Sequence, residues 1–107
     1  MELNQYDIIL VNLAPTIGSE IKKTRPCVII SPDEMNKYLN TVTIAPMTSS
    51  SRKYPTRVSV KHNNKQGWIV IDQIRTIDKQ RIIKLMDRLS QKEIQKTKLV
   101  IKETFVD

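Results

Sequence analysis

The chain has 107 residues, 39% of them hydrophobic, and its 18 Lys and Arg outnumber 11 Asp and Glu to give a net charge of +7. This length indicates a single domain over residues 1–107, and no apolar run reaches the length of a membrane span. The lone cysteine excludes an internal disulfide, and the N-terminus lacks the basic and then apolar pattern of a signal peptide, so we expect a cytoplasmic protein.

The first half of the chain predicts three strands, a loop and a short helix. Strands are expected over residues 8–13, 26–30 and 41–46, and residues 16–23 should form a positively charged loop. Ser31 is expected to cap a helix that ends near residue 40, with Pro32 at its first position and Glu34 completing a capping box. A polar loop follows over residues 49–55.

The second half predicts further strands and a terminal helix. Residues 57–60 alternate like a strand, residues 61–65 form a turn of the kind that Asn tolerates, and residues 68–71, 75–78 and 82–89 are extended. Ser90 and Glu93 form a second capping box, which opens a helix to about Phe105 with one face made of Ile94, Thr97, Ile101 and Phe105. The pattern predicts a mainly β (α+β) fold, a small bent β-barrel with a short internal helix and a C-terminal helix.

The positive charge is concentrated in the middle of the chain. No acid occurs between Glu34 and Asp72, whereas this stretch contains Lys37, Arg52, Lys53, Arg57, Lys61 and Lys65. A surface of one sign attracts a polyanion, which favours a nucleic acid partner over a solvated basic face that binds nothing.

Several kinds of catalytic site are excluded by composition. One His and one Cys cannot build the usual zinc site, and the chain has neither a Gly-rich phosphate loop nor a cluster of acids for two metal ions, so we expect no metal and no cofactor. His62 lies in a turn sequence between lysines, which favours a solvated surface side chain over a catalytic one. We expect Cys27 to be buried and inert and Trp68 to belong to the core, while Tyr38 or Tyr54 could stack on a base.

Three segments resemble the MazF/PemK family of toxins. They are residues 15–20 with 24–31 (PTIGSE and TRPCVIIS), residues 46–50 (PMTSS) and residues 71–78 (IDQIRTID). They occur in the family's order and spacing, and the resemblance covers nearly the whole chain. It implies an SH3-like β-barrel that forms a homodimer, and the toxin of a type II toxin–antitoxin system with a cognate antitoxin as partner. The implied activity is metal-independent, sequence-specific endoribonuclease cleavage of single-stranded RNA (mRNA), leaving 2′,3′-cyclic phosphate and 5′-hydroxyl ends.

The resemblance also assigns site residues. The family's catalytic arginine and threonine correspond to Arg25 and Thr48, and positions around its RNA groove correspond to Ser19, Glu20, Ser49, Asp72, Gln73 and Arg75. The charge of the first loop adds Lys22 and Lys23 as RNA-binding candidates. The chain departs from the family pattern at Lys23 and Ile21, which should alter RNA sequence preference, and at Tyr6, where a glycine is usual. Because Ser19 stands where some members have a histidine, a histidine-dependent mechanism is not expected.

The implied reaction has a physical basis in these residues. The nucleophile is the substrate's own 2′-hydroxyl, a planar guanidinium at residue 25 can hold two phosphoryl oxygens, and a hydroxyl at residue 48 can orient the phosphate. The group that transfers the protons stays open. Two other readings also stay open: a toxin of the same barrel type that inhibits a protein target such as gyrase, and a non-catalytic nucleic-acid-binding barrel.

Overall fold

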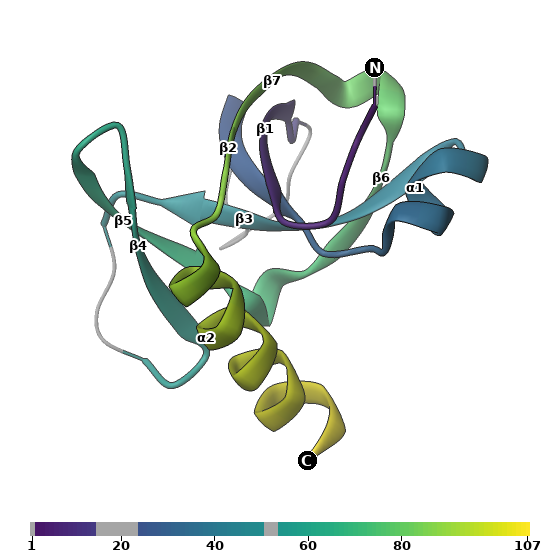
Figure 1. Cartoon of the computed structure of the whole chain (residues 1–107). Coiled ribbons are helices and arrows are strands. Elements are labelled where there is room, and N and C mark those ends of the chain that lie inside the picture. The colour runs from purple at the N-terminus through teal and green to yellow at the C-terminus, as the bar shows by residue number, and fades with distance from the viewer. Residues whose placement is uncertain (1, 15–23, 51–53) are drawn as a thin grey trace.

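Seven strands and two α-helices make up the computed structural model, which describes residues 2–14, 24–50 and 54–107 (Figure 1). The strands are β1 (Asp7–Asn12), β2 (Thr24–Ile29), β3 (Thr41–Thr48), β4 (Arg57–His62), β5 (Lys65–Val70), β6 (Arg75–Asp78) and β7 (Ile82–Arg88). The helices are α1 (Asp33–Tyr38) and α2 (Gln91–Ile101), with short helical turns at Ile71–Gln73, Lys79–Arg81 and Lys102–Val106. The predicted mainly β fold, with an internal and a C-terminal helix, is confirmed. The predicted loop over residues 16–23 lies outside the described residues.

The strands form one curled antiparallel sheet in the order β4-β5-β3-β2-β1-β7, and β6 pairs with β3 beside this path. β3 is the branching strand: Thr41–Ile44 pair with β6, whereas Met47 and Thr48 pair with β5. Pro46, which has no N–H to donate, lies between these two pairings. The sheet therefore divides at Pro46, and the β4–β5 hairpin projects away from the rest of the curl (Figure 1).

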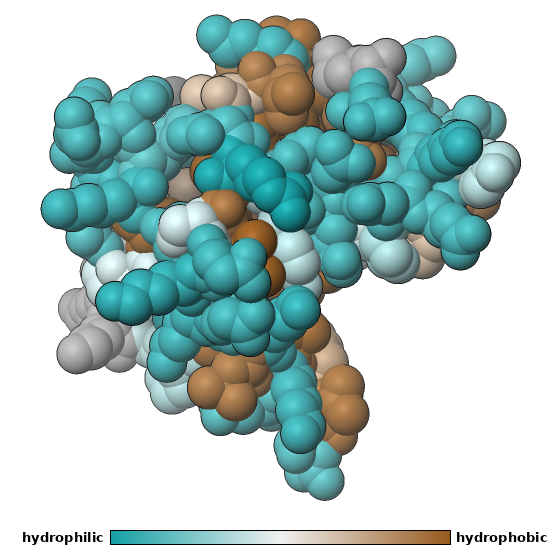
Figure 2. Space-filling view, viewed as in Figure 1, coloured by the Kyte–Doolittle hydropathy of each residue, from teal (hydrophilic) through white to brown (hydrophobic). Residues whose placement is uncertain are grey.

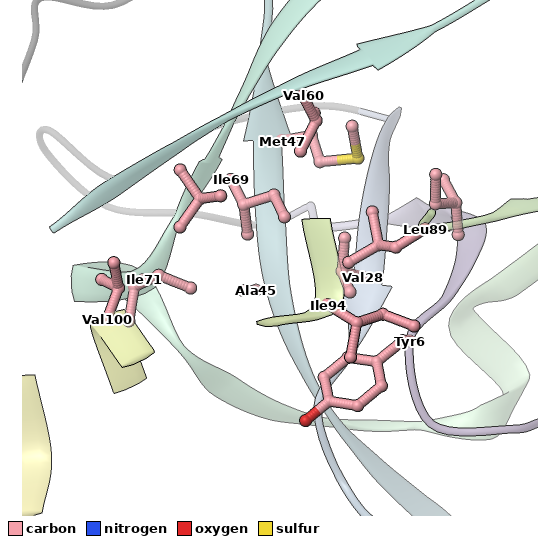
Figure 3. Close-up of a cluster of buried hydrophobic side chains, with 12 residues drawn as sticks. Tyr6, Val28, Ala45, Met47, Val60, Ile69, Ile71, Leu89, Ile94 and Val100 are labelled. Carbon is pink, nitrogen blue, oxygen red and sulfur yellow. The ribbon is translucent and has the colours of Figure 1, made fainter. Parts of the chain in front are cut away.

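β1, β2 and β3 are buried on both faces: successive side chains of a strand point to opposite sides, and each side has its own cluster of buried residues. One cluster of buried side chains lies between the sheet and α2 (Figure 3) and consists of Tyr6, Ile8, Val28, Ala45, Met47, Val58, Val60, Ile69, Ile71, Leu89, Ile94 and Val100. The second cluster fills the other face of β1, β2 and β3 and consists of Leu3, Ile9, Val11, Leu13, Cys27, Ile29, Val42, Ile44 and Ile77. The inner strands are therefore held in place from two sides.

The two predicted capping boxes have different outcomes. At α2 the Ser90 hydroxyl accepts a hydrogen bond from Glu93 N (3.2 Å) and Glu93 Oε1 accepts one from Ser90 N (2.8 Å), as predicted. At α1 the prediction was wrong, because Pro32 occupies the N-cap position without a side-chain hydrogen bond. The Ser31 hydroxyl instead accepts a hydrogen bond from Thr43 N (3.0 Å) and donates one to Asn36. Ser31 thus fastens α1 to β3.

The end of α2 is more exposed than predicted. Ile94 and Thr97 are buried, but the face continues through Val100, and Phe105 is 58% exposed. Beyond Ile101 the chain widens into a π-helical turn that runs past the edge of the sheet (Figure 1), and apolar side chains show on this end of the molecule (Figure 2). No helix in the described part of the chain is long and apolar enough to cross a membrane.

Candidate active site

Arg25 and Thr48 lie together at the end of the β2–β3 pairing. The register pairs Cys27 with Pro46, and Arg25 and Thr48 are each two residues further along their strands. Because Pro26 follows Arg25, the backbone of Arg25 is restricted to extended conformations, which suits its place in β2 opposite Val11. Arg25 and Thr48 line the same cavity, whose volume is about 310 Å³. We call this space the Arg25 cavity.

The Arg25 cavity has a basic lining. It is lined by Arg25, Pro26, Met47, Thr48, Ser49, His62, Asn63, Lys65, Gln66, Gly67 and Met86. Arg25 and Lys65 bring two permanent positive charges, and the described residues of the lining include no Asp or Glu. Cationic and hydroxyl groups without a competing carboxylate are suited to an anionic group such as phosphate.

Thr48 also organises the loop that follows β3. Its hydroxyl donates a hydrogen bond to the carbonyl oxygen of Ser50 (3.1 Å) and accepts one from Ser50 N (3.3 Å). This local turn holds the exposed Ser49 at the wall of the cavity. Ser49 thus lines the same cavity as Arg25 and Thr48.

Cys27 lies beneath the site and is fully buried, as predicted. Burial raises the pKa of its thiol to about 12, although the positive charges of Arg75 and Arg25 act to lower that pKa. The thiol is therefore protonated and inert at neutral pH. Both guanidinium groups lie within electrostatic range of Cys27, and Arg75 pairs with Ile44 on β3, so Arg75 and Arg25 share a face of the sheet.

Asp72 and Gln73 lie in the helical turn after β5 and do not line the Arg25 cavity. Asp72 Oδ1 accepts hydrogen bonds from the Thr56 hydroxyl (2.9 Å) and from Arg57 Nε (3.1 Å). Partial burial alone would raise the pKa of Asp72, but the bonds from Arg57 and Thr56 outweigh it and hold that pKa below its ordinary value. Asp72 thus positions the Arg57 side chain and does not contribute to the Arg25 cavity.

A second cavity of about 390 Å³, which we call the Trp68 cavity, is lined by Tyr54, Pro55, Arg57, Ser59, Trp68 and Lys96. The Arg57 guanidinium lies 5.2 Å from the centre of the Tyr54 ring. The prediction that Trp68 belongs to the core was wrong, because this side chain is half-buried and faces the cavity. Trp68 is the strand partner of Thr48, so the two cavities are neighbours across β3 and β5.

Only some of the basic residues between Glu34 and Asp72 lie at these cavities. Lys65 lines the Arg25 cavity and Arg57 the Trp68 cavity, whereas Lys37 lies on α1, away from the β4–β5 hairpin (Figure 1). The predicted RNA-binding residues Ser19, Glu20, Lys22 and Lys23, and the basic residues Arg52 and Lys53, lie outside the described residues.

His62 contradicts the prediction of a solvated turn residue. It is the last residue of β4 and pairs with Lys65, so that only Asn63 and Asn64, with φ of 54° and 60°, form the turn. Its side chain is 12% exposed and lines the Arg25 cavity. Sequence reasoning missed it because it took the turn to be five residues long; the two adjacent Asn residues were the available signal for a shorter one.

Metal ligands do not gather in the part of the chain that the structure describes: no group of three or more His, Cys, Asp or Glu side chains there could hold an ion.

Comparisons with known proteins agree with this geometry. The family model described as PemK-like, MazF-like toxin of type II toxin–antitoxin system matches residues 4–105. An "Endoribonuclease MazF" of Staphylococcus saprophyticus subsp. saprophyticus is 37% identical over 99 residues, which are 87% of this chain and 82% of that relative. The crystal structure of MazF from Deinococcus radiodurans superposes with a TM-score of 0.85 at 19% identity, covering 96% of each chain. A MazE–MazF structure from the same organism gives 0.80 at 16% identity, covering 99% of this chain and 97% of that one. The chain therefore belongs to the family of PemK-like, MazF-like toxins of type II toxin–antitoxin systems.

Proposed function

We propose that this toxin is an endoribonuclease that cuts single-stranded RNA at a short recognition sequence without a metal ion. The ribose 2′-hydroxyl attacks the adjacent phosphorus, and the products carry 2′,3′-cyclic phosphate and 5′-hydroxyl ends. The observation that carries the proposal is the convergence of Arg25 and Thr48 on one basic cavity. The endoribonuclease relative at 37% identity supports the same reaction class.

The chemistry of the Arg25 cavity fits attack by the substrate's own hydroxyl. No metal-bound water is needed when the nucleophile belongs to the RNA, and DNA, which lacks the 2′-hydroxyl, should not be cut. Negative charge grows on the phosphoryl oxygens in the transition state, and the planar guanidinium of Arg25 can donate to two of them. The Thr48 hydroxyl can exchange its bond to Ser50 for a bond to the phosphate, which would orient the reacting group.

The Trp68 cavity offers a place for a base next to the scissile phosphate. Tyr54 and Trp68 supply aromatic surface, and Arg57 and Lys96 supply positive charge for the backbone. Single-stranded RNA is recognised by bases that are splayed out and stacked on aromatic rings, and each stack contributes about 1–3 kcal/mol. Since Trp68 pairs with Thr48, a nucleotide beside the cut would reach this surface.

The partner of such a toxin is a cognate antitoxin. MazE–MazF structures exist for the Deinococcus radiodurans protein, and the net charge of +7 of this chain suits an acidic segment that binds over the RNA site. We place the action of the toxin in the cytoplasm, where its mRNA substrate is found.

The direct test is to incubate the purified chain with a long single-stranded RNA in EDTA, beside DNA of the same sequence. We expect RNA fragments with 5′-hydroxyl ends and intact DNA. Mass spectrometry distinguishes the cyclic phosphate from the open monoester by one water. RNA that stays intact would refute the nuclease, and cleavage only after addition of Mg²⁺ would refute metal independence.

The role of Arg25 is tested by Arg25→Ala, which should slow cleavage by about two to three orders of magnitude, as loss of one transition-state donor does in comparable sites. Arg25→Lys keeps the charge but loses the paired donors, so we expect an intermediate rate. Lys37→Ala is the matched control, because it removes one positive charge from α1, away from the cavity. An Arg25→Ala enzyme as fast as the wild type would overturn the assignment.

A further inference from the structure

His62 occupies a fixed and shielded position at the wall of the Arg25 cavity. The positive φ angles of Asn63 and Asn64 close a two-residue turn, which places His62 in the last cross-strand pair of the hairpin, opposite Lys65. Its side chain is 12% exposed. A side chain in a solvated turn would be exposed, whereas His62 is held in the wall of the cavity that Arg25 and Thr48 line.

One edge of the imidazole is directed towards a carboxylate. His62 Nδ1 lies 3.4 Å from Asp87 Oδ2, and this nitrogen is buried without an aligned hydrogen bond in the described structure. Asp87 is itself oriented, because its Oδ1 accepts a hydrogen bond from Arg88 N (2.8 Å). A carboxylate at this position favours the tautomer with the proton on Nδ1, because a carboxylate oxygen can only accept a hydrogen bond.

The other ring nitrogen, Nε2, then carries the lone pair and can accept a proton once it gives up its contact with the Asn63 amide. Nε2 has the Asn63 side-chain nitrogen at 3.5 Å, an amide donor that favours an unprotonated Nε2. The charged groups around the ring are Asp87 on β7, Lys65 on β5 and Arg25 on β2, while Lys61 on β4 is exposed. The ring therefore lies between one carboxylate and two cationic side chains.

The cavity has few other groups that could move a proton at neutral pH. Guanidinium and ammonium groups ordinarily titrate far above neutrality, whereas an imidazole ordinarily titrates between pH 5 and 8. Cys27 is fully buried beneath the site. His62 is therefore the described residue of the lining best suited to proton transfer.

We propose that His62 is the general base of the RNA cleavage and that Asp87 is its positioning residue; the inference rests on the endoribonuclease function proposed above. Nε2 takes the proton of the ribose 2′-hydroxyl while that oxygen forms its bond to phosphorus. The P–O5′ bond breaks, and the leaving oxygen keeps the electron pair and takes a proton from water. The imidazolium then returns its proton to the solvent, so that no net proton is gained or lost. The proposal differs from the sequence-based expectation of a histidine-independent mechanism.

The experiment measures single-turnover cleavage of a short RNA with one cut site, in EDTA, across pH 5–9. The wild-type rate should rise with pH through the range in which imidazole titrates. His62→Ala and His62→Gln should lose about 10²- to 10⁴-fold in rate and lose this rise, while binding of the same RNA with a 2′-deoxy residue at the cut site is unchanged. Free imidazole in the buffer should restore part of the activity of His62→Ala, which also proves that the variant is folded.

Asp87→Asn tests the positioning role. We expect a smaller loss than in His62→Ala and a midpoint of the pH–rate profile at lower pH, because the carboxylate that stabilised the imidazolium is gone. Lys98→Ala is the control, since this exposed lysine on α2 does not line the Arg25 cavity and should leave both rate and profile unchanged. An unchanged midpoint in Asp87→Asn would overturn the positioning role.

A substrate with sulfur in place of the 5′-bridging oxygen distinguishes whether His62 acts as the general base or as the general acid. Its leaving group needs no proton, so the defect of His62→Ala should persist with this RNA; a defect that disappears would overturn the base assignment. If the wild-type protein cleaves RNA, Arg25→Ala is slow and His62→Ala is fully active, only the His62 proposal is refuted. Intact RNA with the wild-type protein would refute the proposed function itself.

Discussion

Tyr6 has a backbone conformation that favours glycine. Its φ is 72°, in the left-handed region, and the resemblance had already marked position 6 as a usual glycine. Two backbone hydrogen bonds hold this conformation, from Tyr6 N to the Ile29 carbonyl (2.7 Å) and from Leu89 N to the Tyr6 carbonyl (3.1 Å). Tyr6 is 7% exposed and its ring packs in the cluster under α2 (Figure 3), so the aromatic burial offsets the backbone strain.

Tyr6→Gly should therefore destabilise the protein although it relieves the strain. Relief is worth about 1 kcal/mol, and loss of a buried aromatic side chain costs about 3 kcal/mol, so we expect the free energy of unfolding to fall by about 2 kcal/mol on these two terms. Urea denaturation measures the change. Tyr6→Phe, which keeps the ring and the strain, is the control and should stay close to the wild type. A glycine variant as stable as the wild type would mean that the ring adds no more than the strain removes.

The candidate site was partly accessible from the sequence. Arg25, Thr48 and Ser49, which the family pattern assigns to the site, line one cavity, because their positions follow from two adjacent strands with a simple register. His62 was misjudged, since its burial depends on the exact length of a turn and on Asp87, which belongs to a strand much later in the chain. A local pattern carries no information about such a distant contact.

The N-terminus of α2 is tied to the hairpin through one side chain. Glu93 completes the capping box with Ser90, and its second oxygen accepts a hydrogen bond from Lys61 N (2.9 Å) on β4. Glu93 therefore satisfies one backbone amide at the helix start and one on the strand beside His62. The capping box does more here than stop the helix from fraying.

This double role predicts different costs for the two members of the box. Ser90→Ala should lower the free energy of unfolding by about 1 kcal/mol, the usual cost of a lost N-cap. Glu93→Ala should cost about 2 kcal/mol, because a further hydrogen bond worth about 1 kcal/mol is lost at Lys61. Urea denaturation again provides the values, with the exposed Gln95→Ala on α2 as the control. Equal costs for Ser90→Ala and Glu93→Ala would show that the bond to β4 adds no stability.

The same sequence pattern at α1 had a different outcome for a physical reason. Ser31 and Glu34 have the spacing of a capping box, but Ser31 is 4% exposed and its hydroxyl is occupied by Thr43 N from β3. Ser90 is exposed, and its hydroxyl accepts the hydrogen bond from Glu93 N at the start of α2. The spacing predicts that a cap is possible, and tertiary contacts decide whether the side chain is available for it.

The order of the strands could not be predicted from the sequence. Alternation identified most strands, but both faces of β1 and β2 are buried, so no polar face indicated which way the sheet curls. The branching of β3 at Pro46 into two pairings is a long-range property as well. One consequence of the observed order is that β7 forms an outer edge of the sheet that the described strands build.

That edge carries apolar side chains that a soluble sheet usually avoids exposing. Ile83 and Leu85 on β7 are 52% and 48% exposed, and apolar surface is visible in the region of β7 (Figure 2). An unpaired edge strand is a template for pairing with another strand, and a twofold axis lets one strand pair antiparallel with its own copy. A domain of this size also gains stability from burying more apolar surface. We therefore expect the homodimer implied by the resemblance to form through β7.

Ile83→Lys should shift the protein from dimer to monomer, because each interface would then bury two unpaired charges, one from each copy. Analytical ultracentrifugation over a range of concentrations measures the dissociation constant, which should rise at least tenfold for a cost of about 1.4 kcal/mol or more. Lys84→Gln alters the adjacent position without adding a charge and is the control. If Ile83→Lys dimerises like the wild type while Phe105→Ser does not, the interface lies instead on the exposed end of α2, where Leu99, Phe105 and Val106 offer the other apolar surface.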